Sequence, residues 1–580
     1  MLGFACAHPN LRTSRHHRKV GLTLFLSIPV ELLVDIFGYL SIILHGLTIV
    51  AQSMMLGGIL FLVFLVRPFM HLLPQGTELE RRIARLTIVS AIGLIIAEVA
   101  GVGLQVAVVT STVDLSFLDV MQAPFAIAGT IKILCALLLI PCLSRRMSTG
   151  LRGAALPLLI GAAELTAATF TTHAYARLDH NVLLLCVEGL HQFGAAIWIG
   201  AIPCFVLALS KLHDTNGWRI VGARFSRMSM IGVASIIVSG SVMCVYYIGD
   251  MQGFYGTAYG VMVGAKIAMF LALLLLGLGN LLVTERLRKN QDTSVIRLRR
   301  FAEVEIGIGF TIFFAAASLT SVPPAVDLTT DRVTLHEIAV RNAPAWPRLT
   351  SPDHDQLAVS QAQAQLDREA EQRHQVAAQA VVPGSGVLAP RNADDIAWSE
   401  YNHHWAGIFV LLIGLLALLN RAGVGWLKHW PLLFLLMAGF LLVRSDPEVW
   451  PMGQEGWWAA WRDVEVAQHR FFVALIILFG VFEWAVRTGR LRNPNAALVF
   501  PLLVSVGGAM LLTHSHQISN VKDQLLIELT HTPLALAGVA SGWARWLELR
   551  LPGRGGRIAG WVWPACFMLV GVILLWYREA

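Results

Sequence analysis

Long apolar runs recur along almost the whole chain, and they constrain the fold more than any other feature. Many of these runs reach roughly 18 residues, which is enough to cross about 30 Å of hydrocarbon as a helix. Of the 580 residues, 56% are hydrophobic and 14% are charged, whereas soluble domains carry about 25% charged residues. We therefore predict an all-α, polytopic bundle of transmembrane helices whose main partner is the lipid bilayer.

The apolar runs predict about fourteen spans, in a group of eight and a group of six that are separated by a polar stretch. The first group is expected at 34–66, 84–110, 122–143, 154–173, 183–209, 225–249, 257–284 and 303–322. The second group is expected at 403–420, 429–443, 466–487, 496–514, 525–547 and 559–577. The chain then divides into an eight-span domain (34–323), an extramembrane loop (324–400) and a six-span, histidine-rich domain (401–580).

Residues 1–33 form an N-terminal extension before the first span. The first 19 residues are basic and a short apolar run follows them, as in a signal peptide. No small-residue cleavage site follows that run, so a start assigned too far upstream explains the extension equally well. Neither interpretation gives the extension a function.

Basic residues in the loops predict how the chain is oriented. Lysine and arginine gather in the loops that follow odd-numbered spans, for example around 81–82, 286–300 and 487–492. Loops of this kind face the cytoplasm. The protein is therefore expected in a bacterial inner (plasma) membrane, with the loop 324–400 and the C-terminus on the periplasmic side.

Short matching motifs predict a parallel repeat within the first eight spans. The matches join Arg82-Ile-Ala-Arg85 with Arg224-Phe-Ser-Arg227, Gly129-Thr-Ile-Lys132 with Val263-Gly-Ala-Lys266, and Gly46 and Gly57 with Gly189 and Gly200. Spans 1–4 and 5–8 would then form two four-helix units of the same orientation, an arrangement known in transporters.

Histidines gather near one membrane face. Of the 19 histidines, ten lie in or beside the predicted outer half of the spans: His45, His173, His180, His191, His403, His404, His469, His514, His516 and His531. Imidazole needs hydrogen-bond partners away from water, and ionisable groups in membranes usually face the bundle interior. A hydrogen-bonding role is the simpler explanation for any single one.

The histidines of the second group would converge if spans 9, 11, 12 and 13 pack together. They are His403, His404, His469, His514, His516 and His531. Neutral imidazole is the commonest metal ligand and suits copper, zinc, iron and nickel. We therefore predict that some of them bind a metal ion or a haem.

The first group of spans offers a second candidate metal site. Glu188 and His191 are three residues apart and share a helix face, and His45 aligns with Glu188 in the repeat. Met54 and Met55 lie deeper in the first span. Thioether sulfur suits Cu(I), although methionines in such positions more often pack in a core.

Four charged side chains fall near the middle of the predicted spans: Glu98, Lys132, Glu164 and Lys266. A charge at that depth costs at least ~3 kcal/mol unless it is paired or hydrated. We predict that Lys132 pairs with Glu98 or Glu164. A pair that fixes helix packing and a role in transport both remain open. Glu303 and Glu305, nearer the inner face, are expected to pair with loop arginines.

Motifs of nucleotide hydrolysis and covalent catalysis are absent. The sequence contains no GxxxxGK[ST], GxGxxG, GxSxG or CxxCH, which are the phosphate, nucleophile and haem-attachment motifs. The arginines sit in short loops between apolar runs, which indicates topology rather than nucleic-acid binding. We expect neither enzymatic activity nor a nucleic-acid partner.

Several motifs between 187 and 324 together resemble the copper resistance protein D (CopD) family. They are Val187-Glu188-Gly189-Leu190-His191, Trp198-Ile199-Gly200, Arg224-Phe-Ser-Arg227, Tyr259-Gly260 with Lys266, and Glu305 with Pro323-Pro324. The flanking spans are similar to those of longer, copper-homeostasis members. The resemblance implies a Gram-negative inner-membrane protein that handles copper, with a periplasmic copper carrier of the CopC type as partner. It implies no ligand set.

Three functions fit the sequence. The first is copper transport or homeostasis, in which periplasmic histidines capture the ion and it moves inward or passes to a partner. The second is a haem-binding redox protein with two imidazole ligands from facing helices. The third is an assembly factor that transports nothing. The absorption spectrum and metal content of the purified protein separate the three.

Overall fold

The computed structural model describes residues 30–579 with several internal gaps. The gaps are 74, 114, 145–150, 213, 291–292, 330–331, 354–355, 358–391, 448, 454–455, 459–460, 462–463 and 514–520. Most of the N-terminal extension, a large part of the polar loop, and both His514 and His516 therefore lie outside the described residues. In the described part the regular elements are helices, which confirms the predicted all-α class.

The first group of predicted spans is represented by long helices. They are α1 (Val30–Phe61), α3 (Gly76–Thr112), α5 (Pro124–Ser144), α6 (Leu151–Thr169), α8 (Asn181–Ala195), α10 (Thr215–Tyr247), α12 (Ala258–Lys289) and α13 (Ile296–Leu319). A π-helical turn, η3 (Ala196–Gly200), links α8 to α9 (Ile202–Lys211), and another, η1 (Leu62–Val66), extends α1.

The second group follows the same pattern. Its helices are α16 (Ala393–Arg421), α17 (Leu433–Arg444), α18 (Val464–Arg487), α19 (Val499–Leu511), α20 (Val521–Arg550) and α21 (Arg554–Leu575). Across the described residues, 12 helices are long and apolar enough to span a bilayer, and Gly153–Thr169 and Ala496–Leu511 are shorter apolar helices. The chain is a multi-pass membrane protein, and the count of fourteen spans stays a prediction.

The start of α16 differs from the prediction. The helix begins at Ala393, not at 403, because Asn392 caps it. The Asn392 side chain accepts 2.9 Å hydrogen bonds from the N–H groups of Asp394 and Asp395, and the Asp395 carboxylate accepts one from the Asn392 N–H, which is a capping box. Hydropathy marks only the bilayer-crossing part of a helix. His403 and His404 therefore lie inside α16, not at its first turn.

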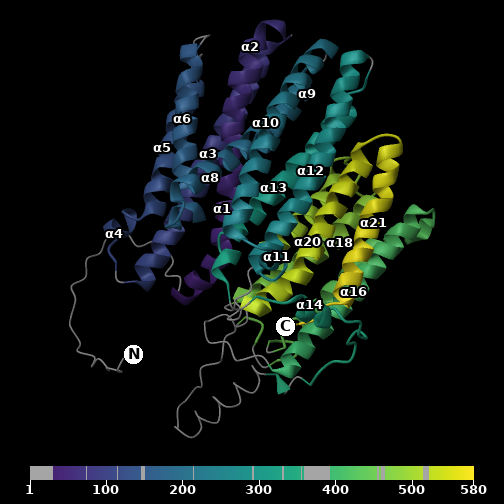
Figure 1. Ribbon diagram of the computed structural model, residues 1–580. Helices are drawn as coiled ribbons and strands as arrows, with labels where there is room; N and C mark the ends of the chain where they lie inside the picture. Colours follow the sequence, from purple (N-terminus) through teal and green to yellow (C-terminus); the bar gives the residue numbers. More distant parts are fainter. Residues whose placement is uncertain are drawn as a thin grey trace.

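The helices stand side by side, with the first group on one side of the bundle and the second group on the other (Figure 1). In the first group α1 packs on α3, α3 on α5, and α5 on α6. In the second group α21 packs between α16 and α20, and α20 also packs on α19. The two groups meet where α20 packs on α12 and α13. One end of the bundle holds α14 (Leu335–Arg341) and the last residues of the chain, and we call it the α14 end.

Two glycines let α1 cross η3 at close range. A Cβ atom on Gly57 would overlap the backbone of Gly200, and a Cβ atom on Gly200 would overlap the backbone carbonyl of Ser53. Small residues at membrane helix crossings permit such an approach. Gly57 and Gly200 are also matched positions in the predicted repeat. Matched positions of two units come together where they lie on the symmetry axis that relates the units. This contact supports the repeat, which stays a prediction.

Candidate functional site

Two of the candidate histidine ligands meet at the α14 end of the bundle. His403 lies on α16 and His531 on α20, and their ring centroids are 6.2 Å apart with planes at 84°. The two side chains come from distant parts of the second group, in keeping with the predicted convergence of its spans. This contact is the starting point of the candidate site.

Hydrogen bonds fix the tautomer of both rings. The Nδ1 atom of His403 lies 2.8 Å from the carbonyl oxygen of Ser399, and that of His531 lies 3.0 Å from the carbonyl oxygen of Ile527. A carbonyl oxygen only accepts, so Nδ1 carries the proton in each neutral ring and Nε2 carries the lone pair. Metal-binding histidines are usually oriented in this way, with one ring N–H held by a carbonyl or carboxylate.

Tyr577 packs against both imidazoles. Its ring stacks on His403 with centroids 3.8 Å apart and meets His531 edge-on at 5.9 Å. The side chain is 2% exposed and directly follows α21 and its C-cap. Tyr577 therefore fills the space beside the histidine pair and closes it from one side.

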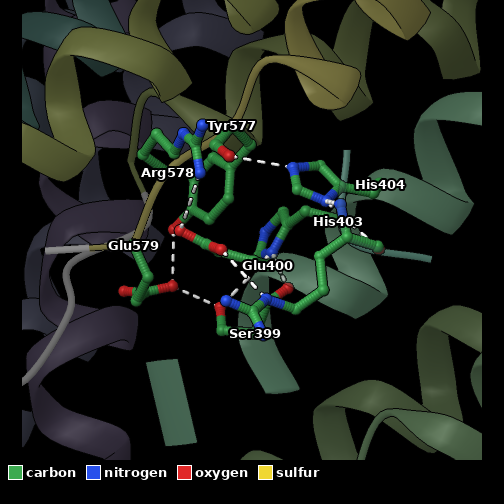
Figure 2. Close-up of polar contacts among 8 residues, drawn as sticks. Ser399, Glu400, His403, His404, Tyr577, Arg578 and Glu579 are labelled. Carbon is green, nitrogen blue, oxygen red and sulfur yellow. Dashed lines mark hydrogen bonds and ion pairs between the residues drawn. The ribbon is translucent and has the colours of Figure 1, made fainter. Parts of the chain in front are cut away.

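The residues after Tyr577 are held in place by a polar network (Figure 2). The Tyr577 hydroxyl donates to Glu579 at 2.8 Å, and the hydroxyl of Ser399 donates to the same carboxylate. Arg578 lies 3.8 Å from Glu400 of α16. Burial and the nearby carboxylate of Glu579 raise the pKa of Tyr577, so the phenol keeps its proton and remains a donor.

His404 uses both ring nitrogens to hold backbone groups. Its Nδ1 accepts a 2.7 Å hydrogen bond from the N–H of Arg348, and its Nε2 donates to the carbonyl of Tyr577 at 3.0 Å, as Figure 2 shows. The side chain is 1% exposed. These bonds fasten the polar loop and the C-terminal residues to α16, and they favour a structural role for His404 over metal ligation.

His469 forms a carboxylate–imidazole pair near the same site. Its Nδ1 lies 2.5 Å from Asp446, whose side chain is 4% exposed, while the imidazole is 40% exposed. His469 begins the apolar part of α18 and is close enough to His403 to interact with it electrostatically. The imidazole of His469 is therefore partly exposed on the surface of the bundle.

The candidate residues of the first group lie in separate networks. The Nδ1 of His191 lies 3.0 Å from the hydroxyl of Ser239 on α10. The Glu188 carboxylate accepts a 3.0 Å hydrogen bond from the side-chain amide of Gln192. The side-chain oxygen of Gln192 accepts another from the side-chain amide of Gln52 on α1. These side-chain amides link α8 to α1, which belong to different units of the predicted repeat.

His45, Met54 and Met55 join neither network. His45 interacts electrostatically with Lys132 of α5, Met55 is fully buried in the apolar core, and Met54 is half-buried. Within the residues that the structure describes, no three His, Cys, Asp or Glu side chains are grouped so that they could hold a metal ion. Within the same residues, His403 and His531 are two candidate ligands whose rings lie in contact.

Lys132 pairs with Glu98, one of the two partners that the sequence predicted. Both side chains are more than nine-tenths buried, and Gly129 leaves room for the carboxylate because its missing Cβ would lie 3.1 Å from a Glu98 oxygen. This pair ties α3 to α5. Glu303 also pairs as expected, with Arg300 at 2.5 Å and with Arg550 at 3.0 Å. The same expectation for Glu305 is wrong, because this buried carboxyl group accepts from the neutral amide of Asn280 and pairs with no described arginine.

We expect Lys132→Met to lower the free energy of unfolding by about 3 kcal/mol, because removing one partner of a buried pair leaves the other without compensation. The double variant E98Q/K132M should recover part of this loss. Thermal unfolding in detergent measures both. Arg288→Gln is the matched control, since its pair with Glu285 is exposed and should contribute under about 1 kcal/mol. Equal unfolding temperatures for K132M and R288Q would contradict the prediction.

The sequence did not single out Tyr577 or Asp446. Asp446 follows the last turn of α17 at the face where the histidines gather, so its position beside His469 could have been inferred from predicted depth. Tyr577 lies among the last residues, two before Glu579, and no pattern indicated that this segment folds back over α16.

Comparison with known proteins identifies the middle of the chain. Residues 219–319, which comprise most of α10 and all of α12 and α13, match the family model of copper resistance protein D (CopD). The chain carries a CopD domain. This finding confirms the family resemblance seen in the sequence. The CopD domain contains neither His403 nor His531, so the histidine pair lies outside the matched residues.

One curated relative matches a longer part of the chain. Copper transport protein CutJ of Bacillus subtilis (strain 168) is 31% identical over 201 residues, which is 34% of this chain and 36% of CutJ. The chain thus matches only about a third of that relative's length. No solved structure gives a significant match.

Proposed function

We propose that this protein captures copper on the periplasmic side of a bacterial inner membrane and moves it inward. The observation that carries the proposal is the pairing of His403 with His531 in a multi-pass protein that has a CopD domain. The name of the relative, a copper transport protein, supports the same assignment. Copper is the cargo here and not a resident cofactor.

The geometry of the pair suits one copper ion between two imidazoles. With metal–nitrogen bonds of about 2.0 Å, two rings on one metal have centroids roughly 5 to 6.5 Å apart. The observed separation is 6.2 Å. Imidazole nitrogen is a favourable copper ligand, and both Nδ1 protons already point to carbonyl oxygens. His514 and His516, outside the described residues, stay predicted as further ligands.

A depression lies beside the polar network that surrounds His403. It has a volume of about 610 Å³, and its lining includes Arg341 of α14, Glu400 of α16 and Glu579. The last two residues are also in the network that surrounds His403. In this proposal a periplasmic copper carrier of the CopC type docks at the α14 end and releases copper there, and exposed His469 is its first acceptor.

The absorption spectrum and the metal content of the purified protein test the proposal. Bound copper without a Soret band would support it. A Soret band would indicate bis-histidine haem instead. A protein that binds neither after incubation with each would point to an assembly factor and would refute copper capture.

We expect copper retention to fall as the pH drops below about 6, because protons and copper compete for imidazole nitrogen. A protonated imidazole has no lone pair, so affinity decreases in the acidic direction and levels off above the ordinary histidine pKa of about 6.5. Copper retained after desalting at a series of pH values measures this. Retention that is constant from about pH 8 down to about pH 3 would exclude histidine ligation.

A further inference from the structure

Each predicted four-helix unit of the first group has a lysine and two glutamates inside its helices. In the first unit they are Lys132, Glu98 and Glu164, and in the second they are Lys266, Glu188 and Glu305. All three are buried in the first unit, whereas in the second unit Glu305 is buried and Lys266 and Glu188 are partly exposed. The lysines are matched positions in the predicted repeat. A single ammonium group balances one carboxylate, so each unit has one carboxyl group more than its lysine can compensate.

The structure shows which carboxyl group is left over in each unit. Lys132 pairs with Glu98, while Glu164 is fully buried and neither of its oxygens has a hydrogen-bond partner. In the second unit Lys266 interacts electrostatically with Glu188. Glu305 of α13 is the remaining carboxyl group, and it is 3% exposed.

The groups around Glu305 are neutral. Asn280 of α12 donates to it at 2.5 Å, and Trp198 of η3 donates as well. From α10, Ser226 and Ser229 face the same space. Within the described part of the chain, no lysine or arginine forms an ion pair with Glu305.

The nearest charged residue to Glu305 along α13 is Glu303, and its carboxylate forms ion pairs with other residues. It is paired with arginines of α13 and α20, and Trp546 of α20 also donates to it at 3.0 Å. Glu303 and Glu305 are only two residues apart, yet among the described residues Glu303 has cationic partners and Glu305 has none.

A cavity reaches Glu305. It has a volume of about 360 Å³, lies between α10, α12 and α13, and is lined by apolar side chains with Ser226, Ser229, Asn280 and Glu305 as its polar groups. The carbonyl oxygen of Asn280 is buried there without a hydrogen-bond partner. A buried acceptor beside a carboxyl group calls for a donor, because unpaired buried polar groups are costly.

We propose that Glu305 is a proton-binding site of the CopD domain, loaded with a proton at neutral pH and exchanging it through this cavity. Binding the proton converts the carboxylate to a neutral acid, whose O–H is a donor beside the buried carbonyl oxygen of Asn280. An ionised carboxylate at this depth would have no compensating charge. Resting on the proposed function, we further propose that this proton is exchanged as copper moves.

Infrared difference spectroscopy tests the proton site without any copper. The spectrum of the wild type minus that of Glu305→Gln should contain a carboxylic-acid C=O band that shifts in D₂O. Glu303→Gln is the matched control, and its difference spectrum should lack the band because ion-paired Glu303 is ionised. Glu305→Asp should restore a shifted band, which covers the case in which Glu305→Gln folds poorly. Identical band areas in the wild type and both Glu305 variants would overturn the proposal.

Proteoliposomes with a trapped pH indicator test the coupling. Copper addition should change the internal pH with the wild type and with E303Q, and E305Q should abolish that change while binding copper with unaltered affinity. An unchanged pH response in E305Q would refute the coupling. If the wild type moves no copper at all, the transport function fails, and the infrared result still decides whether Glu305 holds a proton.

Discussion

Replacing His403 and His531 together with alanine should lower the copper affinity of the purified protein by more than about 100-fold, since loss of an outer-shell partner alone costs 10–100-fold. Both imidazoles have Nε2 in the ligating form because backbone carbonyls hold Nδ1. If the two imidazoles share one ion, each single variant should lose nearly as much copper affinity as the double variant. The effects of mutating residues that contact each other are not additive. Competition with a chromogenic Cu(I) chelator measures the affinity.

The controls separate ligation from general damage. His429 accepts a 2.8 Å hydrogen bond from Trp484 and lies on the predicted cytoplasmic side, so His429→Ala should keep the wild-type affinity. His469→Ala should slow copper uptake and reduce affinity less than loss of the pair. Each variant needs an unfolding temperature close to that of the wild type. Wild-type affinity in a folded H403A/H531A variant would remove the pair from the site.

Hydropathy predicted the helices and their order, because apolar length is what the bilayer requires of each span. The start of α16 could not be predicted this way, since a capping box outside the apolar run sets it. The choice of Glu98 over Glu164 as the partner of Lys132 also needed the structure. All three lie at similar predicted depth, and only helix packing decides which carboxylate faces the ammonium.

The histidine site was predicted less completely than the fold. Predicted depth placed His403 and His531 at one face, and their convergence was predicted only on the condition that spans 9, 11, 12 and 13 pack together. The two imidazole rings are oriented by the backbone carbonyls of Ser399 and Ile527. Because every residue has a backbone carbonyl, the identity of these two residues could not indicate that role. The argument for a structural role of His404, rather than metal ligation, likewise depends on backbone atoms of Arg348 and Tyr577.

Gly57→Val and Gly200→Val should each destabilise the protein by more than about 3 kcal/mol, at or beyond the upper end of ordinary overpacking costs. The added side chain would meet backbone atoms of the opposite helix, and backbone cannot rotate away as a side chain can. The helices would have to separate, which would open the apolar core around neighbouring Met55 and Trp198. We expect little folded protein from either variant.

Thermal unfolding and the yield of monodisperse protein measure this effect. Gly103→Ala and Gly264→Ala are the matched controls, because both glycines lie inside long helices and nothing lies within 4 Å of an added Cβ atom. The free energy of unfolding of these two variants should be unchanged or should rise by up to about 1 kcal/mol, because alanine is preferred over glycine in helices by that amount. Since Gly57 and Gly200 meet each other, the double variant should cost less than the sum of the two single changes. Valine variants that unfold at the same temperature as these controls would show that α1 and η3 do not cross at van der Waals contact.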